Sequence, residues 1–230
     1  MKKIIALLLA CLFACQLPLA LAGTSWYCPQ CGRLNDNNFC PVDGTARPAD
    51  TGSSSYPGIT TSTDNYTTYA YITGTLNAKL ATRTGPGTQY DEPGTFLSAG
   101  SQVTVLSKAY DTRNEIWWIQ VEFSVSGSRY RAYTGLKRFT NLNVSYVPEE
   151  KVIGSCTTGQ SITGYYGPGY NYNRINKKVP AGVSCTIYGY ASSGDSDFIQ
   201  IEFYDRSQGR YRRAWIPDWY ADNVYMYYGF

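Results

Sequence analysis

Short segments in which apolar and polar residues alternate dominate the second half of the chain. Residues 119–123 read Ile-Gln-Val-Glu-Phe, and residues 199–203 read Ile-Gln-Ile-Glu-Phe. A period of two is typical of a β-strand that turns one face to a core. The polar turns at 126–128 and 205–209 then favour a hairpin into the next strand. No part of this half has a convincing helical period, so the sequence predicts an all-β fold.

The same half of the chain repeats itself. Four blocks recur in one order, displaced by 82 positions, or by 80 for the alternating strand. Repetition of this kind is the signature of one fold made twice, so we expect a first domain at 76–148 and a second at 149–230. The matching blocks are 85–90 with 167–172, 99–101 with 181–183, 119–123 with 199–203, and 131–133 with 213–215.

Aromatic residues recur on one side of these strands. If Ile119, Val121 and Phe123 face the core, Trp118 lies on the opposite face. Flat, rigid rings suit proline-rich peptide, short peptide stems or sugar rings as ligands. The alternative is that the rings cover a small barrel or pack the two domains together. The candidate ligand-binding residues are Tyr90, Trp118, Tyr133, Tyr170, Tyr172, Phe198, Trp215 and Trp219.

The two copies resemble bacterial SH3-like domains in tandem, over about residues 76–146 and 156–226. The resemblance rests on the Gly-Pro-Gly loop, the Trp117-Trp118 or Asp197-Phe198 strand start, and the segment 215–220. It implies two small SH3-like barrels, each with a ligand groove between that loop and the strand face. The first copy departs from the pattern at 133–137, which lacks the proline; a groove that uses this turn is altered or lost there.

The N-terminus has the pattern of a secretory signal. Lys2 and Lys3 precede an apolar run of about 12 residues, which is too short for a relaxed membrane span, and the segment ends in Ala-Leu-Ala at 20–22. We expect residues 1–22 to be a signal peptide, and the protein to be secreted or held at the cell surface. Two alternatives stay open: a lipoprotein box ending at Cys15, and an uncleaved anchor, which is the one route by which the chain contacts a membrane.

Three cysteines cluster directly after the signal. Cys28 and Cys31 are two residues apart and precede a glycine, and Cys40 and Asp43 repeat this spacing. Residues 23–48 therefore resemble a zinc ribbon in which Asp43 replaces the last cysteine, and the resemblance implies a structural zinc held by three sulfurs and one oxygen. The alternatives are a disulfide-tied knob with one free thiol, which secretion favours, and a redox cysteine pair.

A Ser/Thr/Gly-rich stretch at 49–75 has few apolar anchors and predicts a flexible linker. Two further cysteines, Cys156 and Cys185, lie in strand-like segments of the second copy. They form either a disulfide or two small buried side chains, and the sequence does not decide between them.

Composition excludes several kinds of enzyme. The chain of 230 residues has no histidine, so it holds no serine–histidine triad, cysteine–histidine peptidase or histidine-based zinc hydrolase. Glu122 and Glu202 occupy the same position in different copies, whereas a glycosidase needs both acids across one bond. The chain has 20 basic and 17 acidic residues and no basic stripe, which argues against nucleic acid as a partner. The cluster Arg210, Arg212 and Arg213 predicts a solvated charged face, or alternatively a contact to an anionic ligand.

These features together predict a secreted, non-enzymatic binding protein. By resemblance, its partner is cell-wall peptidoglycan, through peptide or glycan, or an extracellular protein or peptide. One alternative is a structural or assembly protein whose barrels pack on each other or on a partner. Another is an accessory factor of a cell-wall hydrolase. Asp195, Asp197 and Asp218 are interpreted as loop acids.

Overall fold

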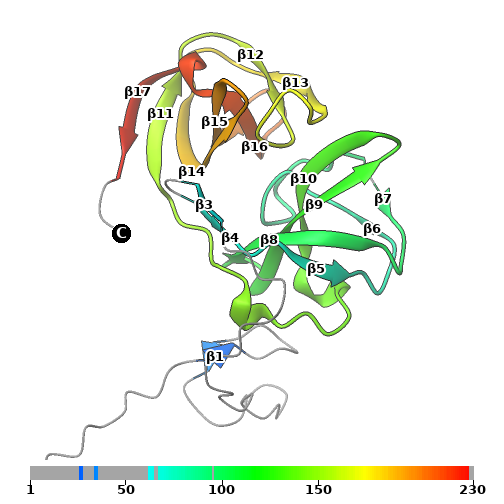
Figure 1. The fold of residues 1–230 in the computed structure, drawn as a ribbon. Helices are drawn as coiled ribbons and strands as arrows, with labels where there is room; N and C mark the ends of the chain where they lie inside the picture. Colours follow the sequence, from blue (N-terminus) through cyan, green and yellow to red (C-terminus); the bar gives the residue numbers. More distant parts are fainter. Residues whose placement is uncertain (1–25, 28–33, 36–61, 65–66, 95, 228–230) are drawn as a thin grey trace, which may run out of the picture.

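A computed structural model describes residues 26–27, 34–35, 62–64, 67–94 and 96–227. These residues form strands and three short 3-10 turns, without an α-helix among them, and the larger sheets are antiparallel, so the predicted all-β class is confirmed. Figure 1 shows two β-units side by side, the first drawn in green and the second in yellow to red. We call residues 70–147 the first unit, 148–153 the connector and 154–227 the second unit.

The first unit is built on a four-stranded sheet in the order β10-β9-β8-β5, beside a separate β6–β7 hairpin. The turns η1 and η2 follow the last strand and lead into the connector. Its elements are β5 (Ile72–Thr75), β6 (Leu80–Ala81), β7 (Phe96–Leu97), β8 (Gln102–Asp111), β9 (Ile116–Val125), β10 (Ser128–Gly135), η1 (Leu136–Arg138) and η2 (Val144–Tyr146).

The second unit is one seven-stranded sheet in the order β13-β12-β16-β15-β14-β11-β17. Each neighbouring pair is antiparallel. Its elements are β11 (Gly154–Thr158), β12 (Ile162–Tyr165), β13 (Arg174–Val179), β14 (Ser184–Ser193), β15 (Ser196–Asp205), β16 (Arg210–Pro217), η3 (Asp218–Tyr220) and β17 (Ala221–Met226).

The two units share their strand order, although β17 of the second unit has no strand counterpart in the first among the described residues. An isolated bridge between Arg83 and Tyr133 ties the β6–β7 hairpin to β10, as Tyr165 and Trp215 tie β12 to β16. A second bridge, from Leu76 to Phe139, stands where β11 pairs β17 in the second unit. Both units also have a β-bulge at the same place. In the first unit it lies in β8, between Val105 and Ser107, and in the second it lies in β14, between Ile187 and Gly189. Such bulges re-aim side chains and are features of a fold, so one arrangement occurs twice.

Each unit has its own hydrophobic core, in the strand phase that the sequence indicates. Ile119, Val121 and Phe123 of β9 belong to one buried cluster, and their counterparts in β15 belong to another. The small Ala132 lies in the first cluster, where it leaves room for the larger apolar side chains around it. Burying each Ile, Val or Phe contributes about 1.5–3 kcal/mol, so the alternating strands stabilise both units independently of the face they share.

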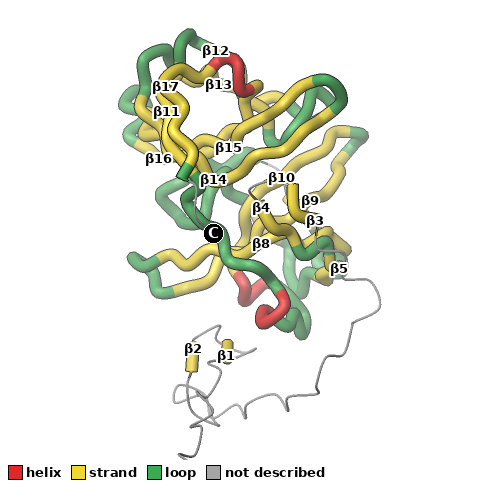
Figure 2. The backbone as a smooth tube through the Cα atoms, turned by 60° about the vertical axis from the view of Figure 1, so that its left-hand side comes forward, coloured by secondary structure: helices red, strands yellow, loops and turns green. Residues whose placement is uncertain are grey.

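Strand structure begins inside the segment 49–75 that the sequence predicts to be a flexible linker. A hairpin of β3 (Ser62–Asp64) and β4 (Thr67–Tyr69) contacts β14 of the second unit and β8 of the first (Figures 1 and 2). The Tyr190 amide donates to Thr67 Oγ1 at 3.1 Å, and Tyr69 is fully buried. Composition missed this because the hairpin has no core of its own and is held by its neighbours.

The connector is fixed to the first unit as well as the second. The Lys108 amide donates to the Pro148 carbonyl at 2.8 Å, and the Glu150 amide donates to the Lys108 carbonyl at 2.8 Å. The Ile153 amide then donates to Ile187 in β14 at 2.8 Å. These bonds hold the connector as an added strand segment rather than a loose tether. Within the described ranges, no helix is long and apolar enough to cross a membrane.

Near the N-terminus, β1 (Trp26–Tyr27) pairs antiparallel with β2 (Leu34–Asn35). The predicted zinc ligands Cys28, Cys31, Cys40 and Asp43 lie outside the described residues, as does the predicted signal peptide at 1–22. The zinc site and the signal therefore stay predictions.

Candidate functional site: a shared face and an open face

The eight candidate ligand-binding residues divide into buried and open groups. Tyr170 and Trp219 have exposed fractions of 57% and 54%. The other six are buried, which differs from the outward face that the strand phase suggests: Tyr90, Trp118, Tyr133, Tyr172, Phe198 and Trp215. Four of these six, Tyr90, Tyr133, Tyr172 and Trp215, are covered because the opposite unit packs against them.

The two units exchange the same hydrogen bond in both directions. The Tyr90 hydroxyl of the first unit donates to Glu202 Oε2 of the second at 2.5 Å. Tyr172, which is 82 positions after Tyr90, donates in turn to Glu122 Oε2 of the first unit. The hydroxyl–carboxylate contact is charge-assisted and hence among the stronger hydrogen bonds. A reciprocal exchange of this kind makes the shared face nearly two-fold symmetric.

Buried arginines complete the same pattern. Arg131 Nε donates to Glu122 Oε2 at 2.8 Å, and Arg213 Nε donates to Glu202 Oε2 at 2.8 Å. Each guanidinium also lies over a ring of the opposite unit: Arg131 is 5.6 Å from Trp215, and Arg213 is 5.2 Å from Tyr133. Cation–π contacts of desolvated arginines are worth about 2 kcal/mol. Each buried arginine is thus paired with a glutamate of its own unit, as buried charges must be, and its ring contact crosses the face.

The connector breaks this symmetry on one side. Arg213 Nη1 donates to Tyr133 Oη at 2.8 Å and to Glu150 Oε2 at 2.5 Å. The Tyr133 hydroxyl donates to Glu150 Oε1 at 2.6 Å and accepts from Gln120 Nε2 at 2.9 Å. Glu150 therefore joins both units and the connector in one buried network, which fixes their relative orientation.

Ionisation of these groups favours the network near neutral pH. Burial opposes ionisation of Glu122, but the Arg131 guanidinium and the hydrogen bonds from Tyr172, Arg131 and Arg129 outweigh it, and its pKa lies below the ordinary value. Burial raises the pKa of Tyr172 to about 12, despite the opposing charge of Arg131. Burial likewise raises the pKa of Tyr90. The tyrosines therefore remain donors and Glu122 an acceptor over a wide pH range.

The arginine cluster of β16 is not the solvated face that the sequence suggests. Arg212 and Arg213 are each 4% exposed, whereas Arg210 is exposed. Arg213 is held by Glu150 and Glu202, as described above, and Arg212 forms ion pairs with Asp91 and with Asp205, the latter at 3.3 Å. The prediction of solvation is wrong for these two residues because the loop of the first unit covers the strand.

The open face lies on the second unit, around the Gly-Pro-Gly loop. The exposed Tyr170 ring packs edge-on against Phe198 at 5.2 Å and against Tyr165 at 5.5 Å. The loop approaches the β14–β15 hairpin closely: a Cβ on Gly169, whose φ is +138°, would lie 2.5 Å from Ser193 Oγ. Only glycine tolerates both this φ and this approach. The loop therefore fixes Tyr170 beside the hairpin and exposes one side of its ring.

Two acids lie near each other, one at the β14–β15 hairpin and one at the turn that carries Trp219. The Ser192 hydroxyl donates to Asp197 Oδ1 at 2.6 Å, and this bond, with one from Tyr190, lowers the pKa of Asp197. Burial and the charge of Asp197 raise the pKa of Asp218, which opens η3. Asp197 and Asp218 are thus close enough to interact. The face presents two carboxyl groups near two exposed rings.

The first unit does not repeat this open face. The positions 82 residues before Tyr170 and Trp219 hold Thr88 and Lys137, and Leu136 stands in place of Asp218. Trp118, the counterpart of Phe198, is buried between Ala109 and Gly135 of the neighbouring strands. The sequence signal for this difference was the missing proline at 133–137. The structure shows that the two copies also differ at the positions of the exposed rings, Tyr170 and Trp219.

Cys156 and Cys185 lie directly opposite each other in β11 and β14, and both side chains are buried. The Cys185 thiol donates to the Val183 carbonyl at 3.3 Å. A hydrogen bond to the Cys156 thiol and burial raise the pKa of Cys185. Directly opposed residues of an antiparallel pair have Cα separations of about 4.5–5.5 Å, which a disulfide accepts. Both alternatives drawn from the sequence therefore stay open.

Comparison with known protein families, curated proteins and solved structures finds no match to this chain.

Proposed function

We propose that the chain is a secreted, non-enzymatic binding protein made of two SH3-like barrels locked together, with one ligand face on the second barrel. The repeated strand order, the bulge at the same place in each copy and the Gly-Pro-Gly loops support the assignment of the barrels. The shared face is occupied by contacts between the units. Recognition of a partner therefore falls to the open face.

The observation that carries this proposal is the exposure of Tyr170 and Trp219 beside Asp197 and Asp218. Tyr170 rests on the buried Phe198 and Tyr165, and Trp219 packs against the half-buried Tyr220. Exposed rings that are held in this way give contact area at low entropy cost. Carboxylates accept hydrogen bonds from sugar hydroxyls and peptide amines. Cell-wall glycan or its short peptides fit this combination, and an extracellular protein or peptide is the broader form of the same partner.

Retention on purified peptidoglycan tests the proposal. The mature chain is expected to co-sediment with the polymer, and the double substitution Tyr170→Ala plus Trp219→Ala is expected to abolish retention. The matched control is Thr88→Ala plus Lys137→Ala, which changes the same two positions in the first unit and leaves retention intact. Absence of retention by the unchanged protein, or equal loss in both double variants, contradicts the proposal.

The reciprocal exchange of Tyr90 and Tyr172 favours a second candidate, in which the barrels serve assembly and no small ligand exists. In that case the open rings contact a protein partner, which includes a cell-wall hydrolase served as an accessory factor. The two candidates separate in the same experiment: an assembly protein is not retained by the polymer alone, and its retention requires added partner.

We further propose that residues 23–48 form a small head that holds one structural zinc through Cys28, Cys31, Cys40 and Asp43. Three thiolates and a carboxylate suit tetrahedral zinc. Elemental analysis of the full mature chain is expected to give one zinc, and Cys40→Ser is expected to remove it. A zinc-free chain with oxidised cysteines in this segment contradicts the metal site.

A further inference from the structure

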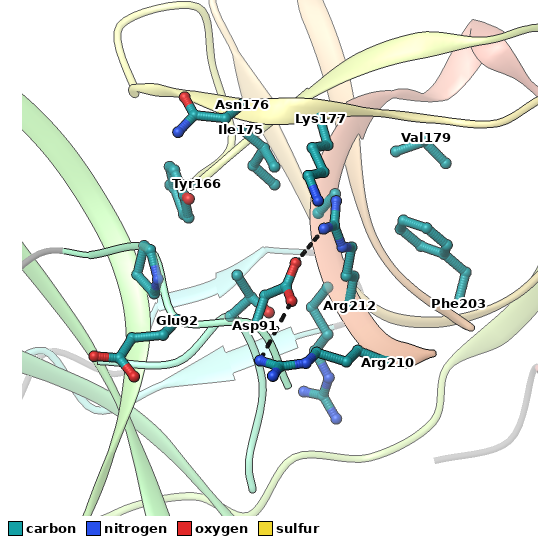
Figure 3. A pocket seen from close by; sticks show the side chains of 14 residues that line it. Asp91, Glu92, Tyr166, Ile175, Asn176, Lys177, Val179, Phe203, Arg210 and Arg212 are labelled. Carbon is teal, nitrogen blue, oxygen red and sulfur yellow. Dashed lines mark ion pairs between the residues drawn. The ribbon is translucent and has the colours of Figure 1, made fainter. Parts of the chain in front are cut away.

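A cavity of about 240 Å³ opens where the first unit's loop meets the outer strands of the second unit. Figure 3 shows Asp91 from that loop facing Arg210 and Arg212 of β16, with Ile175 and Lys177 of β13 nearby, while the Glu92 carboxylate points away from them. Apolar side chains, among them Val179 and Phe203, line one wall, and the charged groups line another. The lining includes neither Tyr170 nor Trp219 of the open aromatic face, and it meets the shared-face network at Arg213.

Rings occupy the symmetry-related place in the shared face. Tyr130 stands where the second unit has Arg212, and it stacks on Phe123 at 5.5 Å and on Tyr166 at 5.2 Å. Its hydroxyl accepts from Asn173 Nδ2 at 2.7 Å. At the cavity, the first unit has the small Thr84 at the position that corresponds to Tyr166 of the second unit. The hollow therefore arises from two substitutions of a large ring within an otherwise repeated interface.

Four cations and two carboxylates line the cavity, and most of them have ion-pair partners. Arg213 is neutralised by Glu150 and Glu202, and Glu92 pairs with Arg83 at 3.3 Å. With these partners and Asp205 counted, the cluster has five cations and five carboxylates, namely Arg83, Lys177, Arg210, Arg212 and Arg213 with Asp91, Glu92, Glu150, Glu202 and Asp205. The cluster is therefore neutral overall, but no ion pair joins Lys177 to any residue that the structure describes.

Two buried polar atoms at the same place also lack partners. Arg212 Nη1 and Thr84 Oγ1 make no hydrogen bond to any described residue, although both side chains are more than nine-tenths buried. A buried donor without a partner costs about 1–3 kcal/mol. A native structure retains such groups where a water, an ion or a ligand completes them.

We propose that this cavity binds the C-terminal carboxylate of a short peptide with small apolar side chains. The Lys177 ammonium, which forms no ion pair with a described residue, and the unpartnered Arg212 Nη1 give two donors, which match the two oxygens of one carboxylate. A guanidinium N–H and an ammonium are strong donors to a carboxylate. The apolar wall at Ile175 and Val179 receives the last side chain, and the volume lies below that of drug-sized sites of about 300–1,000 Å³, which limits the ligand to a chain end.

Calorimetric titration of the full mature chain tests the site with three probes. N-acetyl-dialanine with a free carboxylate is expected to bind, while its C-terminal amide and inorganic phosphate are not. Lys177→Gln is expected to weaken binding about fivefold through loss of one exposed charge contact. Lys178→Gln is the matched control, because this neighbouring lysine of β13 is exposed and does not line the cavity.

The double variant Tyr170→Ala plus Trp219→Ala is expected to bind the acid normally, which separates this site from the proposed ligand face. Equal binding of acid and amide overturns the carboxylate assignment. Binding of phosphate as tight as that of the acid reduces the site to a general anion site and overturns the peptide. If Lys177→Gln and Lys178→Gln weaken binding of the acid equally, or if the unchanged chain does not bind the acid, the cavity is not the carboxylate site.

Discussion

The first and second units share a fold but differ in what their surfaces do. Their strand order, their bulge and their half of the reciprocal hydrogen-bond exchange are the same. Outside the shared face they diverge: Tyr170 and Trp219 are exposed on the second unit, where the first has Thr88 and Lys137. The Tyr–Glu–Arg contacts that join the units are the same in both copies, whereas the exposed ring positions differ.

The shared face itself shows the same lesson on a smaller scale. Glu122 and Glu202 are bound by equivalent arginines, but only Arg213 also reaches the connector, through Glu150. Symmetry thus accounts for the pairing, and the connector accounts for the departure from it. The predictions below use each equivalent pair as its own control.

The largest effect is expected at the two buried arginines. Arg213→Met leaves Glu150 and Glu202 without their guanidinium and is expected to lower the unfolding free energy by about 3–5 kcal/mol. Arg131→Met is expected to cost less, about 2 kcal/mol, because Glu122 keeps its ion pair with Arg129. Urea unfolding of both variants measures the difference. Equal losses would show that the connector network adds nothing to the symmetric pairs.

The opposed cysteines give the next effect. Oxidation is expected to join Cys156 to Cys185 and to stabilise the second unit by about 3 kcal/mol, since the bond closes a loop of about 30 residues. The same cross-strand position of the first unit holds Gly74 and Val103, which cannot respond. Mass spectrometry with and without reductant identifies the bond, and urea unfolding measures its effect. If Cys156 and Cys185 stay reduced under mild oxidant, they are two buried thiols and do not form a disulfide.

Removing the hydroxyl of Tyr90 or of Tyr172 is expected to lower the unfolding free energy by about 1.5–3 kcal/mol at neutral pH, because each hydroxyl donates to a carboxylate of the opposite unit. Tyr90→Phe and Tyr172→Phe are expected to be similar in urea unfolding. The pKa of Tyr172 is raised to about 12 from 10, so its contribution is present below pH 10 and lost as the pH rises through 12. The stability gap between the unchanged chain and Tyr172→Phe should close over that range. A gap that widens reverses the sign and contradicts the assigned hydrogen bond.

The smallest change in stability is expected on the outer faces. Trp219→Ala and Lys137→Ala are each expected to shift the unfolding free energy by less than about 0.5 kcal/mol, as exposed substitutions usually do. Thermal unfolding measures both. A large loss for Trp219→Ala alone would mean that its ring holds the fold rather than a ligand.

The strand phase and the repeat were readable from the sequence because they are local patterns. Ile119, Val121 and Phe123 face the core as the alternation predicts, and the matched blocks coincide with matched strands. The sequence also indicated that Tyr133 and Trp215 share one strand position. Periodicity reports which residues lie on the same face, and for both units it did so correctly.

What covers the opposite face is a long-range property that no local pattern carries. The burial of Tyr90 and Tyr172 depends on how two whole units approach each other. The ordered hairpin at 62–69 likewise depends on β8 and β14 far along the chain. One signal was available: each copy pairs a loop tyrosine with a strand glutamate in the same order, and a reciprocal contact follows if the copies face each other.

The central claim is that the two units are one cooperative body through their shared face, with binding left to the second unit's open side. Native-state hydrogen exchange of the mature chain tests it most directly. The slowest amides of β9 and β10 are expected to open with the same free energy as those of β15 and β16, and Arg213→Met is expected to lower both together. Two separate opening free energies, with Arg213→Met affecting the second unit alone, would contradict the account.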